Sequence, residues 1–188
     1  MIVLGVDPGT RHLGWGLVRA EGTRLTHVAH GVVSPGEERP LAERLLALHD
    51  ALVLLLHEHK PRAAGVESLF FAKDAQAAAK LGHARGVVLL CLERAAVPFA
   101  EYAPAHIKRV VAGNGAADKK QVALVVAALL RLPAPPKSDA ADALAIAITH
   151  ARAATLPPAL RAALLAAPKK QRPRGGRAVV GLRPAREG

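Results

Sequence analysis

The sequence predicts an α/β fold in which helices flank a mixed five-stranded sheet, and three observations support this class. The chain begins with three strand-like segments in succession. Two more short apolar segments then alternate with segments of helical periodicity. The last helical segment is apolar on nearly every side, so we expect it to be largely buried. Successive strands followed by alternating helices and strands are typical of a mixed sheet with helices packed on it.

Five segments have the composition and length of strands. The first, residues 2–6, is a continuous apolar run, and Asp7-Pro8-Gly9 ends it as a turn ends a buried strand. The next two follow so closely that the start of the chain is expected to form a meander. The four later strands are predicted at residues 13–20, 25–34, 62–67 and 97–102.

Five segments are expected to be helical. In the first of them, leucines recur at helical spacing with polar residues between. The second is long and rich in alanine, and Gly113-Asn114-Gly115 separates the third from the fourth. Prolines in residues 133–136 break the chain before the last one. The helices are predicted at residues 41–59, 73–96, 104–112, 118–131 and 138–154.

Length and charge bear on domain organisation and partners. The 188 residues fit one folded domain, expected at residues 1–155, with a basic, Pro/Gly/Arg-rich tail at residues 156–188 that is expected to be largely disordered. The formal net charge is +11, of which residues 168–188 contribute seven Lys or Arg and one Glu. A positive excess in both parts favours a polyanionic partner, most often nucleic acid, over an ordinary basic surface.

Cysteine content and hydropathy bear on the compartment. Cys91 is the single cysteine, which excludes a disulfide or thiolate zinc framework and suits a reducing cytosol. The first residues lack the basic region of a signal peptide, and no apolar run approaches the ~18 residues that a membrane span needs. We therefore expect a soluble, cytoplasmic protein.

Four acidic residues stand at the ends of apolar segments. Asp7 and Glu67 each close a strand, and Asp139 and Asp142 open the last helix. Clustered, partly desolvated carboxylates repel one another, so their pKa values rise or a cation joins them. Oxygen ligands alone suit Mg²⁺ or Mn²⁺, and two such ions can promote phosphodiester hydrolysis. Taken singly, Asp7 could begin a turn and Asp139 could cap a helix, but the four together favour a metal site.

At these residues the chain resembles the RuvC family of Holliday-junction resolvases. The resemblance covers about residues 1–155 in five consecutive blocks, and the segment after residue 155 has no counterpart that we recognise. The blocks are Gly5–Thr10 with Gly14–Gly16, Val66–Lys73, Lys80–Val87, Tyr102–Pro104 with Ile107, Lys108, Gly113–Gly115 and Asp118–Val122, and Ser138–Ala147.

The resemblance implies an RNase H-like fold and an endodeoxyribonuclease that nicks two strands of a four-way DNA junction symmetrically, in recombination and repair. It also implies a homodimer, Mg²⁺ or Mn²⁺ with two ions in each site, 5′-phosphate products, and the RuvAB branch-migration complex as a partner. Small residues in the long helix could pack on the sheet or form the dimer contact that the family suggests. They are Ala75, Ala79, Gly82 and Gly86.

The resemblance also assigns roles to particular residues. Asp7, Glu67 and Asp139 match the catalytic metal-binding acids, and Asp142 matches the fourth acid. A second group is predicted to contact DNA, with Phe70 matching an aromatic residue that inserts into the opened junction and two lysines matching basic residues near the scissile bond. The predicted DNA contacts are Phe70, Lys73, Lys108, Lys119 and Lys120.

Three alternatives remain open from the sequence. The turn Asp7–Thr10 also fits the phosphate-binding turn of actin-like and sugar-kinase-like proteins, although those folds need two such lobes. A non-catalytic DNA-binding module would leave the four acids unexplained. Another RNase H-like nuclease would share the acids but not the basic blocks.

Overall fold

The structure is a computed structural model that describes residues 1–68 and 75–155, and a five-stranded sheet forms its centre. The strands lie in the order β3-β2-β1-β4-β5. The first three pair antiparallel and β4 and β5 pair parallel to β1 and to each other, which confirms the predicted mixed sheet. The strands are β1 (Ile2–Asp7), β2 (Leu13–Glu21), β3 (Arg24–Val33), β4 (Ala63–Glu67) and β5 (Phe99–Tyr102).

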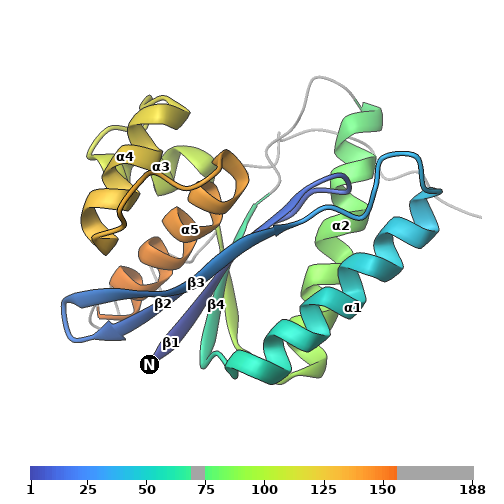
Figure 1. Ribbon diagram of the computed structural model, residues 1–188, viewed down its shortest axis with the longest axis horizontal. Coiled ribbons are helices and arrows are strands. Elements are labelled where there is room, and N and C mark those ends of the chain that lie inside the picture. The colour runs from blue at the N-terminus through green and yellow to red at the C-terminus, as the bar shows by residue number, and fades with distance from the viewer. Residues whose placement is uncertain (69–74, 156–188) are drawn as a thin grey trace, which may run out of the picture.

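Helices cover both faces of the sheet (Figure 1). One face carries α1 and α2, which pack against each other, and the other carries α5, with α3 and α4 over it. The helix predicted to reach residue 96 ends at Arg94, because Ala96 adopts a left-handed backbone with φ 52°. The helices are α1 (Leu41–His59), α2 (Ala75–Arg94), α3 (Pro104–Ala112), α4 (Lys119–Leu130) and α5 (Ser138–Ala154).

Alternation along β1 assigns its residues to the two faces. Leu4 and Val6 belong to the core beneath α1 and α2, whereas Val3 belongs to the core beneath α5. Because successive side chains of a strand point to opposite faces, Gly5 and Asp7 share the α5 face with Val3. The acid that closes β1 therefore points towards α5.

A row of glycines lets α5 lie close to the sheet. Gly5 pairs with Gly16 of β2 and with Gly65 of β4, so three neighbouring strands lack a side chain at the same level. A Cβ atom on Gly5 would lie 2.0 Å from the carbonyl oxygen of Ala143 and 2.5 Å from the amide nitrogen of Ala147. These are backbone atoms of α5, so the helix can take this position only where the sheet is bare.

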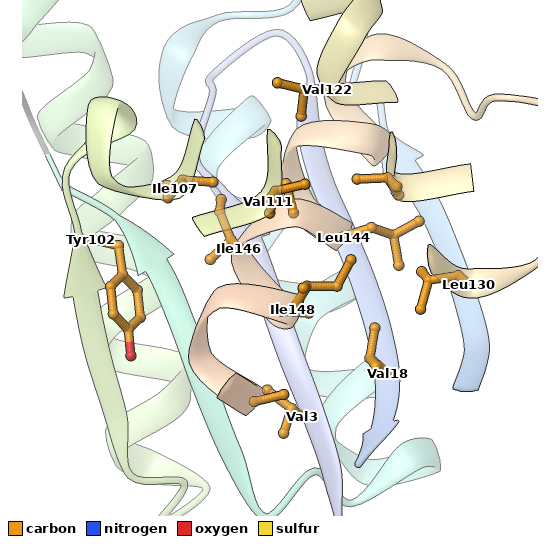
Figure 2. Close-up of a cluster of buried hydrophobic side chains, with 14 of the residues drawn as sticks. Val3, Val18, Tyr102, Ile107, Val111, Val122, Leu130, Leu144, Ile146 and Ile148 are labelled. Carbon is orange, nitrogen blue, oxygen red and sulfur yellow. The ribbon is translucent and has the colours of Figure 1, made fainter. Parts of the chain in front are cut away.

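The rest of α5 is held by a continuous apolar core. Figure 2 shows Leu144, Ile146 and Ile148 of α5 among side chains from β1, β2, α3 and α4. This burial agrees with the prediction from the apolar sequence of the last helix. Residues Ala140, Ala141 and 143–149 are all buried. The apolar core therefore holds α5 at the short distance from the sheet that the glycines permit.

Some sequence predictions lie outside the described residues. These are Phe70, Lys73 and the segment 156–188. Within residues 1–68 and 75–155, no helix has the length and apolar composition needed to cross a membrane.

Candidate functional site

The acidic residues meet where two parallel strands end beneath the first turn of α5. Gly5 and Val6 of β1 are in register with Gly65 and Val66 of β4, so Asp7 and Glu67 follow at the same level of neighbouring strands. Asp7 follows Gly5 by two residues, and Glu67 follows Gly65 by two residues. Both acids therefore lie on the face of the sheet that α5 covers. Asp142, one turn into α5, completes the group.

The three acids line a cavity of about 370 Å³ together with two lysines. Lys108 comes from α3 and Lys119 from the first residue of α4. Apolar side chains from several elements close the remaining walls. These include Pro8, Leu81, Pro104, Ile107, Val122 and Ile146. The cavity thus combines carboxylates with cations inside an apolar rim.

Burial of Asp7 produces a strong electrostatic effect. Loss of solvent, helped by the negative charges of Glu67 and Asp142, raises the pKa of Asp7 to about 8. Burial and Asp142 also raise the pKa of Glu67, while a hydrogen bond with Asp7 opposes the rise. Near neutral pH the protein alone therefore holds Asp7 protonated, and its carboxyl donates to Glu67. A bound cation would release that proton.

Lys119 neutralises part of this negative charge. Its Nζ lies 3.2 Å from Oδ2 of Asp142, and the pKa of Lys119 is raised by the charge of that carboxylate. A capping box at the start of α4 holds the helix end in place, since Asp118 accepts a hydrogen bond from the Gln121 amide at 2.8 Å. The ammonium is therefore held beside the carboxylates, whose charges favour its protonated form.

Asp139 lies apart from the other three acids. It lines a second cavity on the β3 side of the first turn of α5, although its charge still contributes to the raised pKa of Asp7. The alternative that Asp139 caps the helix is wrong, because Lys137 is the N-cap and no side chain makes a capping hydrogen bond. Asp139 instead lies in the first turn, three residues before Asp142.

The donor set suits a hard divalent cation. Asp7, Glu67 and Asp142 offer only carboxylate oxygens, and burial together with the neighbouring carboxylates raises the pKa of Asp7, so a cation would favour its charged form. In the side-chain positions seen across the described residues, no three His, Cys, Asp or Glu side chains enclose an ion site. Some of these oxygens already have partners, since Lys119 lies on Asp142 and Asp7 hydrogen-bonds to Glu67.

Sequence reasoning identified the acids but missed what positions them. Gly5 and Gly65 stand two residues before Asp7 and Glu67. Gly14 accommodates α5 directly, since a Cβ there would lie 2.0 Å from the Asp139 carbonyl oxygen. The pattern of Gly two residues before the acid was readable in both strands. Of the predicted DNA contacts, Lys108 and Lys119 line the acidic cavity, whereas Lys120 borders a separate groove with Leu124.

Comparison with known proteins assigns the chain to a family. A sequence model of the family "Crossover junction endodeoxyribonuclease RuvC" matches residues 3–150. The chain belongs to the RuvC family. It is 59% identical to RuvC of Sorangium cellulosum over 177 residues, which cover 94% of this chain and 99% of that relative. RuvC of Bradyrhizobium diazoefficiens is 51% identical over 79% of this chain and 85% of its own.

Solved RuvC structures share the fold. A Thermus thermophilus RuvC in complex with Holliday junction substrate has a TM-score of 0.77 and 39% identity, covering 82% of this chain and 95% of that one. The fowlpox virus resolvase in complex with Holliday junction DNA, at a TM-score of 0.51 and 12% identity, shares the fold alone. The predicted family and RNase H-like fold are confirmed, and the actin-like alternative is excluded.

The match to the Sorangium relative is longer than the expected domain. The 177 residues aligned with the Sorangium relative exceed the 155 of the expected domain. Similarity to RuvC therefore continues into the segment after residue 155, for which sequence analysis recognised no counterpart.

Proposed function

We propose that this protein is a crossover junction endodeoxyribonuclease that resolves Holliday junctions by hydrolysing one phosphodiester bond in each of two strands. The observation that carries the proposal is the cavity where Asp7, Glu67 and Asp142 meet Lys108 and Lys119, in a chain of the RuvC family. Carboxylates facing lysines suit a phosphodiester, because the lysines hold phosphate oxygens and the carboxylates hold cations that offset its charge.

The reaction is expected to depend on Mg²⁺, with Mn²⁺ able to substitute and two ions in each site. Asp7, Glu67 and Asp142 would hold the metal, and Asp139 would join them from the edge of the first turn of α5. When bound, divalent ions supply charge neutralisation at the scissile phosphate and activation of a water molecule. Asp7 must first lose its proton, and Asp142 must part from Lys119.

The lysines have a distinct part in this scheme. Once released from Asp142, Lys119 can donate hydrogen bonds to the scissile phosphate, and Lys108 reaches the same cavity from α3. The hydrogen bond that each lysine donates to the phosphate becomes stronger as negative charge develops in the transition state. Departure of the 3′ oxygen would leave 5′-phosphate ends, which can be ligated. Phe70, Lys73 and Lys120 are proposed to hold the DNA around the site.

Two symmetric cuts call for two equal sites, so we propose a homodimer with α2 in its interface. Gly82 and Gly86 have nothing within 4 Å of an added Cβ atom, and Leu90 is 54% exposed. A two-fold axis along this open helix face would relate two identical sites.

The remaining expectations concern cellular context and domain organisation. We propose that residues 1–155 carry the chemistry in the cytoplasm and that the basic segment 156–188 adds affinity for DNA. The RuvAB branch-migration complex is the proposed protein partner.

The test is cleavage of a synthetic four-way junction with and without Mg²⁺. We expect paired nicks at symmetric positions only with the metal, and products that DNA ligase reseals. A linear duplex and an RNA–DNA hybrid of the same sequence serve as controls. Equal cutting of the hybrid would favour a different RNase H-like nuclease, and no cutting of any substrate would refute nuclease activity.

A further inference from the structure

A second cavity, of about 490 Å³, lies beside the first turn of α5 on the side of β3, whereas the acidic cavity lies on the side of β4. Among the residues that line it, only Asp139 belongs to the proposed catalytic group. The others come from the β1–β2 loop, from β3 and its end, and from the start of α5. They are His12, His30, Gly31, Val32, Ser34, Lys137 and Ala140.

The bare glycines of β2 create this cavity. Gly14 pairs with Val32, and Gly16 pairs with His30. Because α5 rests on the two glycines, the side chains of His30 and Val32 on the neighbouring strand stand beside the helix rather than beneath it. The space between them and Lys137 is open to solvent along the first turn of α5.

The cavity holds several hydrogen-bond donors, and two of them are oriented by neighbouring side chains. Nδ1 of His12 lies 2.9 Å from Oγ of Ser34, and Nδ1 of His30 lies 2.7 Å from Nε2 of His27. These contacts orient both imidazole rings, and the exposed ammonium of Lys137 adds a full positive charge.

Two carboxylates also lie near the cavity. Arg11 lies 3.4 Å from Glu37, which also lies 3.9 Å from His12, so the arginine offsets its charge. Asp139 lines the cavity itself, at the first turn of α5. Imidazole, hydroxyl and ammonium donors from three separate elements outnumber this one carboxylate and suit an anion with several oxygens, such as a phosphate.

We propose that this cavity binds a backbone phosphate of the strand being cut, one or two nucleotides from the scissile phosphate. The inference rests on the proposed function, since it assumes a strand lying across the acidic cavity. Residues three apart on a helix have Cβ atoms about 5–6 Å apart. Each DNA strand carries one phosphate per about 3.4 Å of helix axis. A strand passing from Asp142 over Asp139 therefore brings the next phosphates to Lys137, His12 and His30.

The test combines modified junctions with protein variants. Cleavage mapping with the wild type first locates the cut. Junctions are then made with one uncharged methylphosphonate at each of the two positions on either side of it. Dissociation constants are measured without divalent metal for the wild type and for the double variant His12→Ala/Lys137→Gln.

At one position, we expect the methylphosphonate to weaken wild-type binding about three- to tenfold, as expected for one charged contact. The double variant should bind the unmodified junction correspondingly less tightly and show no further loss at that position, because the two changes remove the same contact. Its salt dependence should also be less steep, by about 0.9 in log–log slope for a phosphate contact on duplex DNA. Lys137→Arg should keep wild-type behaviour.

The matched control is His57→Ala/Lys60→Gln, which removes the same groups from an exposed position at the far end of α1. This control should keep the methylphosphonate penalty. An equal penalty in the wild type and His12→Ala/Lys137→Gln at every position would overturn the inference, as would unchanged affinity of the double variant. Failure of the wild type to cut any junction would instead refute the proposed function.

Discussion

The two faces of the sheet are packed in different ways. Beneath α1 and α2 the core consists of large aliphatic side chains, with Leu4, Leu48 and Leu52 almost fully buried. Beneath α5 the centre of the sheet lacks side chains, and helix backbone lies directly on Gly5 and Gly14. The first face is built for apolar burial. On the second face, the missing side chains at the glycines allow the start of α5 to lie close to the ends of β1 and β4.

This difference indicates that the face beneath α1 and α2 mainly stabilises the fold, whereas the face beneath α5 positions the acids. A face packed through long side chains tolerates small shifts of its helices, because side chains can adjust. A helix that rests on backbone cannot move inward, and its height decides where Asp142 stands. Four predictions test this division, beginning with the largest expected effect.

Asp7→Asn should abolish cleavage while preserving junction binding. The amide keeps the size of the side chain but removes a negative charge that the proposed metal requires. Since metal ions supply several kcal/mol in such reactions, the rate should fall by at least about 10³-fold. Single-turnover cleavage and a binding titration measure the two effects. Wild-type cleavage by this variant would show that Asp7 has no role in the chemistry.

Gly5→Ala and Leu52→Ala form a matched pair on opposite faces. The new Cβ at Gly5 would lie 2.0 Å from α5 backbone, so the helix must move. A shift of about 1 Å can cost roughly 10²-fold in rate. Leu52→Ala should cost about 2–5 kcal/mol of stability and leave cleavage by the folded protein close to normal. Thermal unfolding and single-turnover rates separate the two. Equal rate losses in both variants would contradict the division between faces.

Metal concentration and pH should together affect the free energy of unfolding of the protein, through Asp7 on the α5 face. The pKa of Asp7 rises from 3.8 to about 8 on folding, so between these values the folded chain holds a proton that the unfolded chain releases. Stability of the metal-free protein should therefore fall as pH rises through this window, by at most about 1.4 kcal/mol per pH unit.

Mg²⁺ should offset that loss, with about 2.7 kcal/mol of stabilisation at a hundredfold excess over its Kd. Melting temperatures at pH 5 and pH 8, with and without Mg²⁺, test the expectation. Asp7→Asn serves as the control, because it should flatten the pH dependence. A melting temperature that does not respond to metal at pH 8 would argue against a cation site.

Leu90→Glu on α2 should have the smallest effect on the fold. Leu90 is exposed in the single chain, so the change should alter the stability of a protomer by no more than about 0.5 kcal/mol. If α2 forms the dimer contact, light scattering after gel filtration should show monomers. A junction would then be nicked in one strand at a time. An unchanged dimer would place the interface elsewhere.

Much of this fold was predictable because local rules and tertiary packing agree. The apolar strands ending at Asp7 and Glu67, the helix at Leu41–His59 and the buried last helix all follow from residue periodicity. The end of α2 at Arg94 was not predicted, because the left-handed backbone of Ala96 carries no signature in residue type.

Residue order alone shows which acids stand at the ends of apolar segments, and the five blocks point to the family. The packing of α5 on the sheet is what brings Asp142 into one cavity with Asp7 and Glu67, whereas Asp139 lines a second cavity. It also brings Lys119 to Asp142. These positions could not be predicted from residue order, because they depend on the rotation of α5 and on its distance from the sheet. Backbone contacts with glycines more than a hundred residues away set both.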